Sequence, residues 1–462
     1  MAACVAAAAP AVAQTQTERP TGGPFTGLFK GSPKSQPHTL DLQASGFAAW
    51  DDNLVNLAPG GSIGNALDAV DPRLLKQGVA SGFQGSVNYG FHKGGTRSQF
   101  SLGGNASVQE FASALSADPF WFHSYGGSTS LTTKVTSKTS ISFAGGAAYA
   151  PFYQYAPFLA NTASEESPVG TDYGYAVNSA WVRSASASAS VSNQFSKRST
   201  ISAGLSWDQR VIPANEDSSI DTRAISTRFS HSLTRKLAFY IGYGIQELRN
   251  GLEANGKPLR SNLLDVGLGY GDGLTLSLGR RTTLSLSGGA SIMKNGDPAL
   301  VAKTGKGTAF AIEGSAMLSR SIGRDWGASL GYARHTGYMV GFSDLITTDS
   351  ANAGIGGPLT ERLQFSAGAG ASRGQQVFAV STGSLVSYTA STRLSFALFS
   401  HLGLYGQASY YRFSIPADFN NFGFVPELNR RSVSVGLNTW LPLIKQRRAR
   451  RDPGAPTGTG QP

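Results

Sequence analysis

Long runs in which apolar and polar residues alternate recur along the chain and constrain its fold more than any other feature. Apolar side chains occupy nearly every second position of Leu264–Leu278, and Ala185–Val191 alternates alanine or valine with serine. A period of two is that of a β-strand, whose successive side chains point to opposite faces. These runs are longer than the ~5–6 residues of an ordinary strand. The sequence therefore predicts an all-β chain with unusually long strands.

Short polar turns separate the runs at a spacing of about 40 residues, a period that β-propeller blades also show. The turns centre near residues 93, 137, 197, 235, 280, 323, 361 and 400. A propeller blade fits four short strands into such a period, whereas each period here holds two long runs. The pattern favours a β-barrel built hairpin by hairpin.

The two faces of the predicted strands differ in the solvent that they suit. One face carries Ser, Gly, Thr, Gln and Asn with almost no Lys or Glu, and only 15% of the chain is charged, against roughly 25% in soluble domains. The other face carries Leu, Val, Ile and Ala, with aromatic residues towards both strand ends. Near the short turns these are Phe91, Phe100, Phe143, Phe195, Phe239, Trp326, Phe365 and Phe396, and near the long loops Tyr149, Trp181, Trp207, Tyr243, Tyr332 and Tyr410. An apolar band between two aromatic girdles predicts contact with lipid outside and water inside.

The turns also predict the number of strands and their orientation. Eight hairpins give 16 strands, and a first strand at Thr39–Trp50 and a last at Val433–Leu441 bring the total to 18. Alternation is weakest in Ile220–His231 and Ala351–Pro358, which leaves 16 strands as the alternative. Short turns are expected on the periplasmic side and long loops outside. The predicted long loops include Asp51–Gln77, Ala112–Phe122, Gln154–Tyr173, Met293–Lys306, His335–Ala351 and Ser414–Asn429.

Both ends of the sequence differ from the alternating region. Residues 1–13 end in Ala-Val-Ala and predict a cleaved signal peptide, truncated because a basic start is missing, so we expect the start codon to lie upstream. Cys4, the single cysteine, excludes an intrachain disulfide, and its acylation as a lipoprotein is the alternative. We expect residues 14–37 to form a periplasmic N-terminal segment, 38–442 the barrel, and 443–462 a flexible, basic periplasmic tail.

From about Thr39 to Leu441 the pattern of long hairpins, a serine-rich face that suits water, and aromatic girdles resembles that of the porin-like outer-membrane β-barrel proteins of Gram-negative bacteria. The resemblance implies a single transmembrane antiparallel up-and-down barrel in the outer membrane, surrounded by outer-membrane lipid and inserted by the barrel-assembly machinery. Such barrels commonly end on an aromatic residue. Here Trp440-Leu441 is followed by further residues up to Pro462, which departs from that pattern.

The sequence predicts no catalytic, cofactor or metal site. Gly370–Gly374 matches G-x-S-x-G, but the nucleophile elbow needs a strand-to-helix turn and no helix pattern follows, so an esterase using Ser372 ranks last. The six histidines show no paired spacing. The basic run Lys445–Arg451 is read as a solvated tail, and nucleic acid is not expected as a partner.

The remaining candidates are charges on the predicted lumen face, since charged rings tune a pore. They are Asp41, Asp208, Arg210, Arg228, Asp265 and Glu313. Their alternative role is that of isolated wall charges paired with neighbours.

Two functional hypotheses follow. The first is a porin-like channel for passive diffusion of small hydrophilic solutes. The second is a non-conducting or export-associated barrel, either a component of polysaccharide export or a surface-interaction protein. The solute, the oligomeric state and the presence of a constriction loop stay open.

Overall fold

The computed structural model describes residues 38–51, 78–92, 97–113, 120–151, 181–212, 215–234, 238–250, 259–270, 276–279, 281–294, 307–323, 325–338, 345–378, 383–414, 416 and 427–443. Almost all of them lie in β-strands. The strands are β1 (His38–Asp51), β2 (Gly78–His92), β3 (Ser98–Ser113), β4 (Phe120–Lys134), β5 (Thr139–Pro151), β6 (Trp181–Asn193), β7 (Ser199–Ile212), β8 (Asn215–Ser232), β9 (Ala238–Asn250), β10 (Leu259–Tyr270), β11 (Leu276–Gly279), β12 (Thr282–Lys294), β13 (Thr308–Ile322), β14 (Trp326–Tyr338), β15 (Leu345–Pro358), β16 (Leu363–Gln376), β17 (Leu385–Phe399), β18 (Leu402–Ser414) and β19 (Glu427–Pro442). Within these residues no helix is long and apolar enough to cross a membrane.

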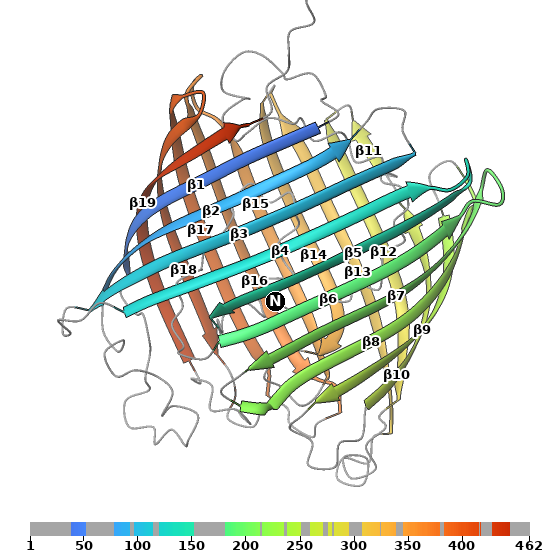
Figure 1. Cartoon of the computed structure of the whole chain (residues 1–462). Coiled ribbons are helices and arrows are strands. Elements are labelled where there is room, and N and C mark those ends of the chain that lie inside the picture. Colours follow the sequence, from blue (N-terminus) through green and yellow to red (C-terminus); the bar gives the residue numbers. More distant parts are fainter. Residues whose placement is uncertain are drawn as a thin grey trace, which may run out of the picture.

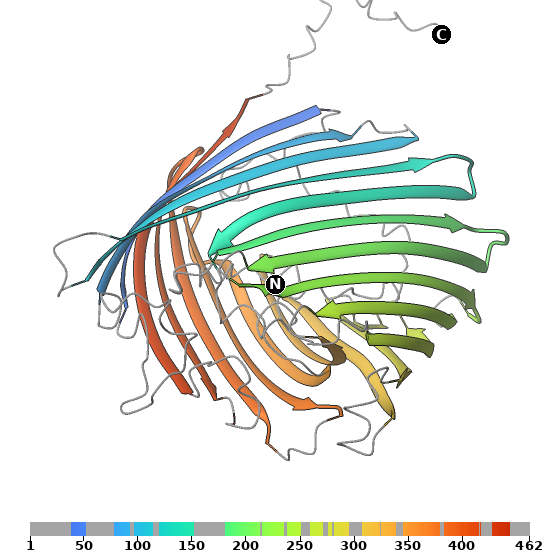
Figure 2. The same cartoon turned by 60° about the horizontal axis from the view of Figure 1, so that its bottom comes forward.

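Apart from β10 and β11, the strands pair antiparallel with their neighbours in the sequence, and the sheet closes on itself (Figures 1 and 2). The first and last strands form the seam, where Asp41 lies opposite Pro442 and Asp51 opposite Ser432. Both β10 and β11 pair with β12, so they occupy one position in the wall. The molecule is thus an 18-stranded up-and-down barrel, which confirms the predicted fold. The 16-stranded alternative is wrong, because the two doubtful stretches lie in the full-length strands β8 and β15.

Hydroxyl side chains organise the short turns. Thr136 Oγ1 accepts hydrogen bonds from the backbone N–H groups of Lys138 and Thr139, at 3.1 and 2.9 Å. Thr360 Oγ1 accepts in the same way from the two backbone N–H groups of Arg362 and Leu363. A hydroxyl that caps these amides replaces the water that a tight turn excludes, and it favours the turn over continued strand.

One turn depends on glycine. Gly323, between β13 and β14, has a φ of +64°, a left-handed conformation that residues with a Cβ adopt only at a cost. Its position matches the predicted turn near residue 323.

The long connections are shorter than predicted in two places. The expected loop His335–Ala351 is mostly strand, since β14 runs to Tyr338 and β15 starts at Leu345. Similarly, β3 reaches Ser113 and β4 begins at Phe120. At these ends apolar and polar residues no longer alternate: β4, for example, begins with the three aromatic residues Phe120, Trp121 and Phe122, so the period of two no longer marks the strand.

The outer surface of the barrel is apolar. Phe83, Leu205, Ile225 and Phe310 are exposed by more than half of their surface. On β19 the outward residues run from Val433 to Leu441, a span of about 20 Å for a rise of about 3.3 Å per residue and a tilt near 40°. That height is close to the ~25 Å apolar band of transmembrane barrels. A continuous apolar belt of this kind is stable against acyl chains and unstable against water, so the barrel spans a membrane.

Candidate functional site

The inner face of the barrel is the candidate functional site, and short hydroxyl side chains dominate it. Cross-strand register places serines directly opposite each other, and their Oγ atoms hydrogen-bond. The Oγ–Oγ distance is 2.6 Å in each of the pairs Ser101–Ser130, Ser107–Ser124 and Ser372–Ser387. Each hydroxyl therefore has a partner while its small size leaves the lumen wide.

Asp208 and Arg210 lie two residues apart on the inner face of β7 and form an ion pair. The Asp208 Oδ1 atom is 3.2 Å from Arg210 Nε, and the two side chains are only 14% and 10% exposed. Two opposite charges at this distance cancel most of their field at the lumen. This pair stabilises the wall more than it attracts an ion.

Arg228 stacks on an aromatic ring of the neighbouring strand. Its Cζ atom lies 4.6 Å from the centroid of Tyr240, whose hydroxyl donates a 2.8 Å hydrogen bond to the carbonyl of Gly288. The ring lies over Gly267, where any side chain would collide with it. Backbone register also places Asp265 in the same cross-strand row as Arg228, with Gly242 between them.

Glu313 takes part in a separate cluster on β12–β14. Ser291 Oγ donates to its Oε1 atom at 3.2 Å, and His335 Nδ1 lies 3.5 Å from Oε2. Asp41 lies on β1 beside the seam, opposite Asn88 and Pro442. The six predicted charges therefore do not form one ring: Asp208 and Arg210 meet, Arg228 and Asp265 share a row, and the other two lie elsewhere.

The sequence analysis did not single out two inward-facing arginines, Arg393 and Arg430. Arg393 lies 4.1 Å above the ring of Tyr405, and that ring covers Gly436 on the next strand. Alternation in the sequence could have indicated this direction, because Arg393 directly precedes Leu394, which faces outward on β17. Arg430 is 4% exposed, and it was missed because β19 begins six residues before the predicted start at Val433.

The arrangement at Arg228 and that at Arg393 are the same. In each, an arginine covers a tyrosine that follows a short turn, and the tyrosine covers a glycine one strand further on. We call these the two Arg–Tyr–Gly triads, Arg228–Tyr240–Gly267 and Arg393–Tyr405–Gly436. They lie on strands β8–β10 and β17–β19, nearly opposite each other in the ring (Figure 2). Two positive groups thus face the lumen from opposite walls near its short-turn end.

One wall of the lumen is open and the other is covered towards the long-loop end. The inward serines Ser101, Ser128, Ser186 and Ser188 on β3–β6 are exposed. In contrast, inward residues near the long-loop ends of β15, β17 and β18 are buried, with 2% exposure or less at Ile346, Leu385, Ser387, Tyr411 and Phe413. We refer to these sides as the open wall and the covered wall.

A residue just beyond β16 reaches inward. Phe378 packs against Met293 on β12 and Ala311 on β13, two strands of the wall that are not adjacent to β16. The start of the β16–β17 connection therefore turns into the barrel. The sequence gave no sign of this contact, which depends on chain segments far apart.

The described residues offer no other chemistry of the kinds considered. Ser372 lies inside β16, 6% exposed and bonded to Ser387, so the strand-to-helix turn of a nucleophile elbow is absent there. No group of three potential metal-ligating side chains occurs in the part of the chain that the structure describes.

Comparisons with known proteins give only distant likenesses. No family model and no curated protein matches the chain. Among solved structures, a BenF-like porin from Pseudomonas fluorescens Pf-5 matches with a TM-score of 0.44 and 11% identity, covering 88% of this chain and 99% of that one. Pseudomonas aeruginosa OccK2 (OpdF), solved in complex with glucuronate, gives 0.42 and 13% over 88% and 98%. Acinetobacter baumannii OccAB4 gives 0.42 and 13% over 88% and 99%.

Proposed function

We propose that the protein is an outer-membrane channel through which small hydrophilic solutes diffuse passively. The observation that carries the proposal is a closed ring of 18 strands whose open wall presents exposed serines. Barrels of 16 to 18 strands are wide enough to hold a water-filled channel.

The same proposal includes the route to the membrane. Residues 1–13 would direct export and be removed, and the tail 443–462 would stay in the periplasm. Residues 1–13, and the tail beyond Leu443, lie outside the described residues. N-terminal sequencing of the mature protein tests the cleavage site before Gln14.

Neighbouring positions on β6 provide a direct test of conduction. In a Cys4→Ala background, Ser188→Cys places a thiol on the open wall and Ala187→Cys places one on the outer face. We expect steady single-channel steps in planar bilayers, which a charged, water-soluble thiol reagent reduces in Ser188→Cys. The Ala187→Cys channel is the matched control and should keep its conductance.

The covered wall favours a second candidate, a barrel that does not conduct and serves export or surface interaction. The buried inner residues of β15–β18 and the inward Phe378 reduce the free cross-section. Correctly folded protein that inserts into bilayers without any conductance would reject the channel and favour this candidate.

A further inference from the structure

Arginines line the outside of the barrel at its long-loop end. On eight strands an arginine faces outward close to the edge of the apolar band, no more than two outward-facing residues beyond it. These residues, the outer arginine belt, are Arg183, Arg223, Arg249, Arg260, Arg334, Arg373, Arg412 and Arg431. They are all exposed.

At the opposite end, exposed arginines also occur, but most of the described ones lie in the short turns: Arg97, Arg198, Arg281 and Arg362. Among the described strand residues near the short turns, Arg320 is the one outward arginine. Outward arginines on the strands themselves are therefore concentrated at one end of the barrel, the end that we expect to contact the outer leaflet.

Carboxylates hold part of the belt in place. Asp221, Glu247, Asp349 and Glu427 form ion pairs with belt arginines, so the belt has eight guanidinium groups and four described acidic partners. An excess of fixed positive charge at the edge of an apolar surface attracts anions that sit at the same depth.

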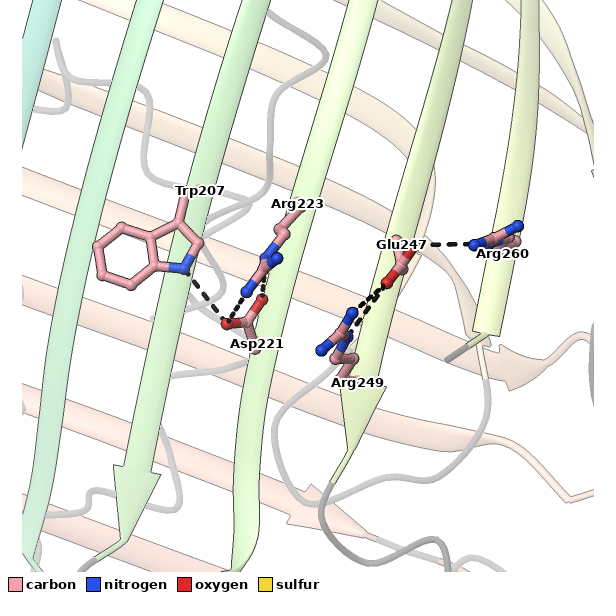
Figure 3. A network of polar contacts seen from close by, with 6 residues as sticks. All are labelled: Trp207, Asp221, Arg223, Glu247, Arg249 and Arg260. Atoms are coloured by element: carbon pink, nitrogen blue, oxygen red, sulfur yellow. Dashed lines mark hydrogen bonds and ion pairs between the residues drawn. The ribbon is translucent and has the colours of Figure 1, made fainter. Parts of the chain in front are cut away.

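The densest part of the belt is a network on β7–β10 (Figure 3). Arg223 Nε donates to Asp221 Oδ1 at 3.0 Å, and Asp221 also accepts from the indole N–H of Trp207. Glu247 binds both Arg249, at 3.0 Å, and Arg260, at 3.4 Å. The side chains of Arg223 and Arg249 are each 55% exposed and that of Arg260 is 69% exposed. Three oriented guanidinium groups thus share two carboxylates and keep N–H donors towards the surroundings.

An apolar groove begins at this network. It has a volume of about 740 Å³ and lies on the outer face of β4–β9, between side chains that include Leu131, Phe143, Leu205, Ile225 and Ile245. Its floor contains Ala187 and Ala189, whose small size creates the hollow, and its lining also includes Trp207, Arg223 and Glu247. Apolar walls that end at cationic groups match a molecule with an acyl chain and an anionic head.

We propose that this groove and Arg223, Arg249 and Arg260 form a binding site for a phosphate-bearing lipid of the outer leaflet. The acyl chain would lie along Leu205, Ile225 and Ile245, and the phosphate would meet the guanidinium groups. Guanidinium presents parallel N–H donors that fit phosphate oxygens, and this pairing is stronger away from bulk water. The inference rests on the outer-membrane location proposed above, but not on conduction.

The test measures lipid retention by the purified full-length barrel in neutral detergent, using native mass spectrometry with diphosphorylated lipid A as the probe. The triple variant Arg223→Gln/Arg249→Gln/Arg260→Gln should bind about tenfold more weakly or worse, since it loses several charge-assisted hydrogen bonds. Arg320→Gln, the outward arginine at the other end, is the matched control and should retain lipid like the wild type.

Two further arms separate the parts of the site. Ala189→Trp fills the groove without changing charge and should also weaken binding, whereas dephosphorylated lipid should bind weakly to the wild type. Inorganic phosphate should not displace the lipid, because the acyl chain supplies part of the affinity. Equal binding by the wild type and the triple variant, or displacement by inorganic phosphate alone, would overturn the proposal.

Folding and function are monitored separately. Heat-dependent mobility in gels shows whether each variant is a folded barrel, and Arg223→Gln alone serves if the triple variant does not fold. A triple variant that conducts normally but loses lipid supports the site. A wild type that binds lipid but never conducts would reject the channel and leave the site standing.

Discussion

At the scale of single residues, the face of the wall decides what each side chain does. Arg210 and Arg223 are only a strand apart, yet Arg210 faces the lumen and pairs with Asp208, whereas Arg223 faces outward and pairs with Asp221. Alternation along the strand was enough to place Arg210 on the lumen face from sequence. Pairing across strands was not, because the contact of His335 with Glu313 depends on the register of β13 and β14.

The Asp208–Arg210 pair should stabilise the wall only while both members are present. Asp208→Asn leaves Arg210 charged and largely buried, which we expect to lower the free energy of unfolding by about 3 kcal/mol. Urea titration of folding into lipid vesicles measures the change. The double variant Asp208→Asn/Arg210→Gln should recover most of it, and a double variant as unstable as the single one would contradict this reading.

The two triads should influence ion selectivity. Arg228→Gln together with Arg393→Gln removes positive charge from opposite walls, so the reversal potential in a salt gradient should shift towards cations. Arg412→Gln, on the outer face, is the control and should leave it unchanged. An unaltered potential in the double variant would mean that the triads have a purely structural role.

At the scale of elements, the hairpins were the most predictable part of the fold. Alternation interrupted by short polar segments located all eight short turns, but the strand ends on the long-loop side were misplaced. In Arg334–Thr336 and Thr347–Asp349 both faces are polar, so sequence offers no contrast there, although the register of β14 and β15 continues. The inward turn of Phe378 was beyond prediction for another reason: its partners lie on β12 and β13.

The turn caps should contribute measurably to stability. Thr360→Val keeps the shape of the side chain but removes the acceptor of two backbone N–H groups, with an expected cost of about 1 kcal/mol. Vesicle folding titrations again provide the measurement. Thr360→Ser retains the hydroxyl and should remain near the wild type, and equal losses in both variants would show that the hydroxyl is not responsible.

At the scale of the whole molecule, closure depends on the seam between β1 and β19. Every other interface joins strands that are close in the sequence, whereas this one joins the two ends of the described barrel. Without β19, both β1 and β18 would be edges with unpaired backbone groups in lipid, each of which costs several kcal/mol.

Removal of β19 should therefore abolish the barrel. A chain that ends before Glu427 is expected to show no heat-dependent mobility shift and to aggregate in vesicles. A chain that ends after residue 443, which keeps β19 and removes the predicted tail, should fold like the full-length protein. A compact, protease-resistant barrel from the shorter chain would show that the seam is dispensable.

The contrast between the open and covered walls has a consequence for any molecule in transit. Its path would lie next to the serine-lined strands β3–β6 and away from the central axis of the barrel. Such a molecule would slide with one flank against hydroxyl groups and the other against a packed, rigid surface. Substitutions of equal size should then change the flux of solute unequally. The change should be large on the serine-lined strands β3–β6 and negligible on the covered wall.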